Sequence, residues 1–541
     1  MPDQSKKEGP HQPHPLANAA EAARLLGALR GSDPLTALGE LGGWLESAKD
    51  LPDEDDKKRA EILAAVQDAS EPHLAALTGQ FVGQAAGSHA MRESKWTGLN
   101  DYLRGLTGAL FATATRLLRD AAGNAALQPA AAAVAARTLH ACRLLAKSYL
   151  LRYQSVPPKV WRLAYTVHAH AEDAGCAAAP VRLHGTYKTS SSANAELLRL
   201  LLLQVGAPDM LPPEQIEIAD RAAEQFGGDF VLRPPSAQDN PFIFHPGSDA
   251  PPQRAPDTPP PAEQGYRYFG AGMGYGALEK LNREFAKATP AEPTPLGKDI
   301  PVHAQAAALR HLAAFWGPFN PYAPPARSPA SGTLPVVQGF GQVWQQLSSA
   351  GTGKMELSLV EESETPAAQA TGEQAWPLRD TGGNELGVEV PQAAADLARC
   401  GALLAVKKPG DSAWSLAVIR SMHAEPEQPL VAHIAILSSS PRVVRLLPHG
   451  TSADVTGHYS AEAMRQFATY GGGVRAIILS DGGGPGVQAA NLMIPPDQWK
   501  AGRLYETTVG TTQRLLRGLQ LLRRGDDYVR ATFEWAIRPP E

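Results

Sequence analysis

The feature that most constrains the fold of this 541-residue chain is a change in the spacing of its hydrophobic residues near Thr333. Before that point, apolar side chains recur every three to four residues, the spacing that places them on one face of an α-helix. After it, apolar runs are short and are separated by Gly, Asp and Pro, which is typical of strands joined by turns. A chain of this length exceeds what one core holds. The sequence therefore predicts a multidomain α+β protein.

The helical pattern extends over residues 15–233. In the segment NAAEAARLLGALR, the spacing i, i+3, i+4, i+7 places four apolar side chains on one helix face: Ala22, Leu25, Leu26 and Leu29. Similar segments follow one another with short loops and without a repeat of fixed length. We therefore expect an α-helical bundle or an irregular solenoid.

Composition sets the remaining boundaries. Residues 1–14 are polar and proline-rich, and we expect them to be disordered. Proline is also abundant in residues 234–265; because it lacks the N–H group that helices and sheets need, we expect a loop or linker there. Residues 266–320 return to a helical pattern and are expected to form a helical extension. The β-rich region then covers residues 325–541.

The β-rich region contains many short apolar runs that predict strands. These are LPVVQGF, KMELSLVEE, WPLRD, LGVEV, ALLAVKK, WSLAVIRSMHA, LVAHIAILSS, RVVRLLPHG, VRAIILSD, AANLMIP and ATFEWAI. Many short strands with turn signals between them indicate a β-barrel or a sandwich.

Charge and cysteine content argue against several classes of function. The net charge is −5 and no basic run stands out, whereas a nucleic-acid surface normally shows a basic stripe. The three cysteines, Cys142, Cys176 and Cys400, are too far apart for a zinc knuckle or a disulfide framework. No stretch approaches the roughly 18 apolar residues of a membrane helix, and the N-terminus lacks a signal-peptide core. We expect a cytoplasmic protein with no metal, no nucleic-acid partner and no transmembrane segment.

Motifs for catalysis are weak. The segment YFGAGMGYGALEKL alternates glycine with other residues, unlike the G-x-G-x-x-G of dinucleotide sites, and no βαβ pattern surrounds it. A helix entry is the expected structure there. His168 and His170 are two positions apart on a predicted helix, so their rings point to different faces and cannot form a His-x-x-x-His metal pair. Without a nucleophile motif or a carboxylate pair, we expect no enzymatic activity and no cofactor.

The segment WPLRDTGGNELGVEV predicts two strands around a turn. Residues 376–379 and 386–390 are the expected strands, and residues 380–385 the turn. Asp380 offers two acceptor oxygens, and the glycines allow a ligand to approach the backbone. The alternatives are a ligand-binding turn and an ordinary turn between strands.

The order of these segments resembles the PilZ domain, a small bacterial β-barrel that binds cyclic di-GMP. The resemblance depends on the strand–turn–strand at 376–390, the strand WSLAVIR and the strand AHIAIL, and it extends over residues 325–541. It implies an antiparallel β-barrel; because the region is longer than one PilZ barrel, the alternatives are one enlarged barrel and two small ones.

The helical half is similar, more weakly, to larger bacterial proteins in which a helical region precedes an atypical PilZ-like end. The segments that carry this similarity are KVWRLAYTVHAHAEDAG, ELLRLLLLQVGAPDMLPPEQI and LRHLAAFWGP.

The resemblance also implies a ligand site. PilZ domains use an R-x-x-x-R motif before the barrel and a [D/N]-x-S-x-x-G motif on a strand–turn. Guanidinium groups suit phosphate oxygens and the O6/N7 edge of guanine. Here Arg327 stands at the first arginine, but Ser331 replaces the second. Asp380 matches the second motif, with Gly382 at the serine position and Gly387 as the final glycine.

Two functions follow from this resemblance. In the first, the protein is a signalling effector that binds cyclic di-GMP through Arg327, Arg379 and Asp380, beside Gly382 and Gly387, and relays the signal to an unidentified protein partner through its helical half. In the second, it is an interaction scaffold that has lost the ligand. Strand alternation predicts that Arg379 and Asp380 face opposite sides, which argues against Arg379 as the replacement arginine.

Overall fold

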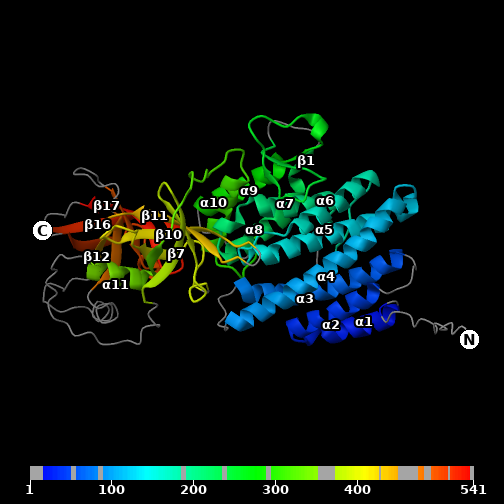
Figure 1. Cartoon of the computed structure of the whole chain (residues 1–541), viewed down its shortest axis with the longest axis horizontal. Helices are drawn as coiled ribbons and strands as arrows, with labels where there is room; N and C mark the ends of the chain where they lie inside the picture. The colour runs from blue at the N-terminus through cyan, green and yellow to red at the C-terminus, as the bar shows by residue number, and fades with distance from the viewer. Residues whose placement is uncertain are drawn as a thin grey trace, which may run out of the picture. The chain divides into compact units, whose positions relative to one another are not determined.

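The computed structural model of the chain describes residues 16, 18–49, 56–82, 89–183, 190–233, 240–287, 294–350, 372–395, 397–425, 428–448, 473–479, 489–509 and 512–536. It divides into two compact units (Figure 1): a helical unit formed by Met1–Pro208 and Pro213–Tyr322, and a β unit formed by Asp209–Pro212 and Ala323–Glu541. The N-terminal stretch 1–14, expected to be disordered, lies outside the described residues, as does the strand expected at KMELSLVEE.

The helical unit contains ten α-helices among its described residues. They are α1 (Ala19–Ala28), α2 (Pro34–Lys49), α3 (Asp56–Val82), α4 (His89–Ala121), α5 (Gln128–Leu150), α6 (Pro158–Asp173), α7 (Ala193–Val205), α8 (Pro213–Phe226), α9 (Gly272–Lys287) and α10 (Val302–Phe315). Within the described ranges, none of the helices combines the length and the apolar content that crossing a membrane requires.

Helix α5 is the centre of this unit. Of its 23 residues, 17 are buried, and it packs against α4, α6 and α7. Alanine is frequent along α5, which lets neighbouring helices approach closely while the helix keeps a high intrinsic propensity. Several buried residues of α5 are charged, and they are described below.

A small antiparallel sheet accompanies the helices, with strand order β1-β4-β2-β3. Its strands are β1 (Val231–Arg233), β2 (Phe242–Phe244), β3 (Gln253–Arg254) and β4 (Arg267–Gly270). The segment 234–265 was expected to carry no strand, and β2 and β3 correct that expectation. Proline keeps these strands to two or three residues, but the buried Phe242 packs on Phe269 with ring centroids 5.3 Å apart and holds the segment in the core.

The alternating glycines of YFGAGMGYGALEKL lie where β4 ends and α9 begins. A Cβ atom on Gly274 would lie 2.6 Å from the carbonyl oxygen of Phe226, and Gly270 and Gly272 have positive φ angles of 110° and 79°. Close packing and a tight entry into α9 account for these glycines.

The β unit contains two six-stranded antiparallel barrels, which answers the question of one barrel or two. The first barrel is built from β6 (Thr333–Gln338), β7 (Gln374–Gly382), β8 (Glu385–Glu389), β9 (Leu403–Val406), β10 (Ser415–His423) and β11 (Val431–Ser438). Their order is β7-β6-β9-β10-β11-β8, and pairing of β7 with β8 closes the ring. A two-residue strand, β5 (Ser328–Pro329), pairs with the end of β7.

The second barrel closes in the order β12-β13-β14-β17-β16-β15. Its strands are β12 (Arg442–Pro448), β13 (Val474–Leu479), β14 (Ala489–Ile494), β15 (Leu504–Val509), β16 (Thr512–Arg524) and β17 (Val529–Ala536). The predicted architecture, a helical region followed by antiparallel barrels, is therefore confirmed.

One element of the β unit was not expected. Helix α11 (Phe340–Ala350) follows β6, and its residues Phe340, Val343 and Leu347 are buried in a cluster with residues of both barrels. Their spacing of three and four residues is a helical signal inside a segment otherwise dominated by strand patterns.

Candidate functional site

The predicted strand–turn–strand at residues 376–390 forms the hairpin of β7 and β8. Asp380 pairs with Gly387 across the two strands, and Gly382 pairs with Glu385. The loop between the strands is therefore only Gly383 and Asn384, shorter than the expected turn. Gly383 has a positive φ of 55°, as such tight hairpin loops require.

A row of cross-strand neighbours, most of them polar, runs over four strands of the first barrel. Asp380 on β7 lies opposite Gly387 on β8, Gly387 lies opposite His433 on β11, and His433 lies opposite Ser421 on β10. On β8 and β11, the residues that flank this row along the strands are buried: Leu386, Val388, Ala432 and Ile434. Since alternate residues of a strand face opposite sides, the row lies on the outward face of the barrel.

Arg327 reaches this face from the segment just before β5. Its Nη1 donates to Asp380 Oδ1 at 2.7 Å, and its Nη2 donates to Glu385 Oε2 at 2.7 Å. The pairing of Ser328 with Thr381 anchors the backbone beside Arg327. The structure thus brings together the linker arginine and the motif aspartate, 53 positions apart in the sequence.

Glu385 also holds a second arginine, which the sequence did not suggest as a site residue. Arg420 Nε lies 3.1 Å from Glu385 Oε1, and the side chain of Glu385 is only 6% exposed. Arg420 lies at a β-bulge of β10, between Ile419 and Ser421. A bulge position cannot be read from hydrophobic alternation, so no signal in the sequence pointed to Arg420.

Arg379 lies on the same face as Asp380, so the expectation that they face opposite sides is wrong. A bulge between Leu378 and Asp380 shifts the register of β7 against β8. Arg379 Nε lies 3.6 Å from Glu389 Oε1, and Glu389 shares its strand face with Gly387. The bulge removes the alternation on which the expectation depended.

Both motif glycines make room for site residues. A Cβ on Gly387 would lie 2.5 Å from both carboxylate oxygens of Asp380. A Cβ on Gly382 would lie 2.6 Å from the carbonyl oxygen of Ala326, next to Arg327. The segment that carries Arg327 fills the space beside Gly382, and the Asp380 carboxylate fills the space beside Gly387.

Two histidines complete this surface. Burial lowers the pKa of His433 to about 4, and the charges of Arg327 and His423 act in the same direction. Burial also lowers the pKa of His423. The two rings are 5.2 Å apart, and His433 Nδ1 lies 3.1 Å from Ser421 Oγ. Both shifts favour the uncharged form of the imidazole at neutral pH.

The ion pairs on this face contain equal numbers of guanidiniums and carboxylates. Three guanidiniums, from Arg327, Arg379 and Arg420, face three carboxylates, from Asp380, Glu385 and Glu389. Guanidiniums bind phosphate and the O6/N7 edge of guanine, and a carboxylate accepts from the N–H groups of guanine. Among the residues that the structure describes, no group of three or more His, Cys, Asp or Glu side chains is arranged to hold a metal ion.

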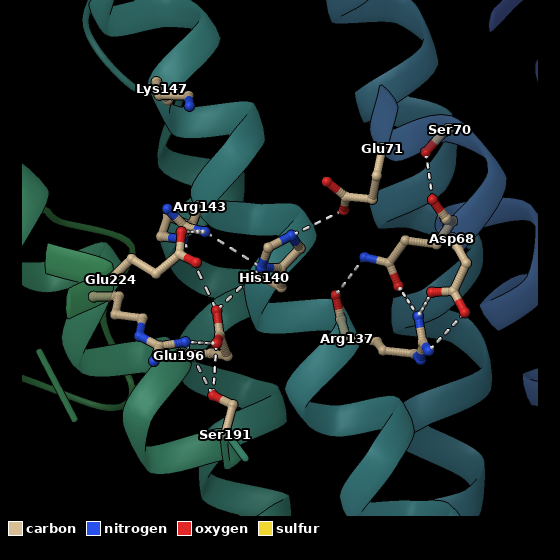
Figure 2. Close-up of polar contacts among 12 residues, drawn as sticks. Asp68, Ser70, Glu71, Arg137, His140, Arg143, Lys147, Ser191, Glu196 and Glu224 are labelled. Carbon is tan, nitrogen blue, oxygen red and sulfur yellow. Dashed lines mark hydrogen bonds and ion pairs between the residues drawn. The ribbon is translucent and has the colours of Figure 1, made fainter. Parts of the chain in front are cut away.

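The helical unit contains a second polar cluster, which is buried (Figure 2). His140 lies between two carboxylates: its Nδ1 is 3.3 Å from Glu196 Oε2, and its Nε2 is 3.1 Å from Glu71 Oε1. One turn along α5 from His140, Arg143 pairs with Asp220. One turn further, Lys147 Nζ is 2.7 Å from the other carboxylate oxygen of Asp220. These contacts join α5 to α3, α7 and α8.

Hydrogen bonds and neighbouring charges shift the pKa values of the groups in this buried cluster. Burial alone would lower the pKa of His140, but hydrogen bonds to Glu196 and Glu71 raise it to about 9. Burial would raise the pKa of Glu196, whereas its bond to His140 and the charges around it hold that pKa well below its ordinary value. This cluster was not expected from the sequence. Arg137, His140 and Arg143 nevertheless recur every third residue in a helix of Ala and Leu, which is a signal for a polar stripe.

Comparison with known proteins bears on the helical unit. Residues 20–236 match a family model described as "Cyclic-di-GMP receptor FimW, N-terminal domain". The match, less than half of the chain, includes α2 to α8 and the buried cluster and ends before the first barrel. No curated protein and no solved structure matches the chain.

Proposed function

We propose that the protein is a bacterial cytoplasmic signalling effector that binds cyclic di-GMP on the outward face of its first barrel. The observation that carries this proposal is the match of residues 20–236 to the N-terminal domain of a cyclic di-GMP receptor. In this proposal the β-rich region 325–541 is the ligand-binding part. The helical region 15–233 engages a protein partner.

The arrangement of the first barrel supports the proposal chemically. Arg327 and Arg379 supply guanidinium donors for phosphate or for the O6/N7 edge of a guanine. Asp380 accepts from guanine N–H groups, and Gly382 and Gly387 keep the backbone beside it open. Arg379 joins Asp380 on one face because of the bulge in β7.

The second candidate function is an interaction scaffold without a ligand. The observation that favours it is the charge balance: each of Arg327, Arg379 and Arg420 already contacts a carboxylate. A ligand phosphate has to compete with these internal partners, and a surface without excess positive charge does not attract anions over a distance.

Isothermal titration of cyclic di-GMP into the full chain separates the two candidates. We expect a dissociation constant in the micromolar range or tighter, and weaker binding for Asp380→Ala and Arg379→Ala. A lost charged hydrogen bond of about 1.5–3 kcal/mol weakens binding by about 10- to 100-fold.

Arg517→Ala is the matched control. Arg517 on β16 forms a cross-strand ion pair with Glu534 at 3.3 Å, and the two side chains are 50% and 36% exposed. The Arg379–Glu389 pair is 45% and 36% exposed. The control should bind as the unchanged protein does. If the unchanged protein releases no heat with cyclic di-GMP at millimolar concentration, the scaffold is the correct function.

A further inference from the structure

The deepest anionic group on the outward face of the first barrel is the carboxylate of Glu385. Each of its oxygens contacts a different arginine: Oε2 accepts from Arg327 Nη2 at 2.7 Å, and Oε1 lies 3.1 Å from Arg420 Nε. A phosphodiester also presents two oxygens on one atom, and these oxygens share one negative charge. Two guanidiniums that one carboxylate bridges are therefore close enough for one phosphate to bridge.

The two arginines come from different parts of the barrel. Arg327 precedes β5, whereas Arg420 projects from the bulge of β10. The usual spacing of two arginines in one linker is absent, because Ser331 stands four positions after Arg327. Folding supplies the second guanidinium from a strand 93 positions later.

Exposure differs between the arginines and the carboxylate that joins them. The side chains of Arg327 and Arg420 are 21% and 37% exposed, whereas Glu385 is 6% exposed. Both arginine side chains are therefore partly accessible from solvent, whereas the carboxylate that they share is almost fully buried. A phosphate that arrives from solvent has to displace Glu385 from these donors.

We infer that Arg327 and Arg420 form a phosphate clamp, with Arg420 as the second arginine, and that Glu385 occupies this clamp when no ligand is bound. The inference rests on the proposed binding of cyclic di-GMP and assigns the residues that hold one of its phosphates. Glu385 keeps the two guanidiniums in place and competes with the phosphate, since both anions use the same donors.

The test is isothermal titration of cyclic di-GMP into the full chain and three variants: Arg420→Ala, Glu385→Gln and the double variant. Thermal unfolding of each variant checks that it is folded. We expect Arg420→Ala to weaken binding by about 10- to 100-fold, the effect of losing one charged hydrogen bond. Glu385→Gln keeps the shape of the side chain but removes the competing charge, so binding should tighten several-fold.

The double variant distinguishes direct contact from an indirect effect. If Arg420 touches the phosphate, the double variant still binds more weakly than Glu385→Gln alone. The factor should be smaller than the one by which Arg420→Ala weakens the unchanged chain, because Arg420 and Glu385 are in contact and their effects are not additive. If Arg420 only neutralises Glu385, removing both groups restores binding, and the clamp is refuted.

The titrations distinguish a failure of the clamp from a failure of the proposed function. Absence of binding by the unchanged chain and by Glu385→Gln refutes the proposed function, and the clamp with it. Binding by the unchanged chain that Arg420→Ala leaves the same refutes the clamp alone. Tightening in Glu385→Gln together with weakening in Arg420→Ala supports both.

Discussion

His140 is a buried residue whose protonation affects the stability of the helical unit. It is buried in α5 between Glu71 and Glu196, with Arg143 Nη2 3.4 Å from its Nδ1. Its pKa of about 9 in the folded chain lies above the ordinary histidine value of 6.5. A group whose folded pKa is raised binds its proton more tightly in the folded state, so protonation stabilises the fold.

The sign of this effect predicts the pH dependence of stability. The contribution of His140 is fully present below pH 6.5 and is lost as pH rises through about 9. This rise in the pKa of His140 from 6.5 to about 9 corresponds to about 3 kcal/mol in the free energy of unfolding. We expect urea unfolding of the full chain to show this decrease between pH 6.5 and 9.

The variant His140→Gln should be less stable at pH 6.5 and should lack the decrease, because no proton is gained or lost at that position. His245→Gln, at a partly buried histidine of the same unit, is the control and should keep the decrease. An unchanged pH profile in His140→Gln would show that other groups produce it.

At the scale of the element, the hairpin of β7 and β8 depends on the absence of a side chain at Gly387. A Cβ there would lie 2.5 Å from both oxygens of Asp380, closer than nonbonded atoms allow. We predict that Gly387→Ala displaces the Asp380 carboxylate and breaks its 2.7 Å contact with Arg327. The cost should be about 1–3 kcal/mol in the free energy of unfolding.

Thermal and urea unfolding of Gly387→Ala measure this cost. Gly372→Ala is the control, because a Cβ on Gly372, two residues before β7, meets no atom within 4 Å. That substitution should change stability by less than about 0.5 kcal/mol. Equal stability of the two variants would mean that Asp380 moves aside at no cost.

Elements with a strong hydrophobic period could be predicted from the sequence, and irregular ones could not. The helices α1 to α8 and most strands of both barrels follow from periods of 3.6 and 2. The structure also brings Arg327 and Asp380 together as one site, while ligand binding there stays a prediction. The bulges at Arg379 and Arg420 were missed because one inserted residue changes which side a strand faces without changing its composition.

Helix α11 and strands β15 and β16 were missed for a different reason. Helix α11 is a stretch of eleven residues with a helical hydrophobic period inside a strand-rich region, so the surrounding pattern obscured it. In β16, arginine and leucine alternate irregularly, and two register shifts against β17 explain the irregularity. Local sequence does not show how a strand pairs, and tertiary contacts decide such cases.

At the scale of the whole molecule, the helical unit and the β unit have separate cores. The buried charges that join α3, α5, α7 and α8 lie in the helical unit, and the proposed ligand site lies in the first barrel of the β unit. A perturbation of one core should therefore leave the other core's unfolding temperature unchanged.

Differential scanning calorimetry of the full chain tests this separation. We predict two unfolding transitions. His140→Gln should lower only the transition of the helical unit, because it leaves Glu71 and Glu196 without their shared partner. Saturating cyclic di-GMP should raise only the other transition, since a ligand that binds the folded form stabilises the part that holds it, by about 2.7 kcal/mol at 100 times its dissociation constant. A single transition that both perturbations shift would show instead that the two units unfold as one, and that a signal received by the barrel changes the stability of the helices directly.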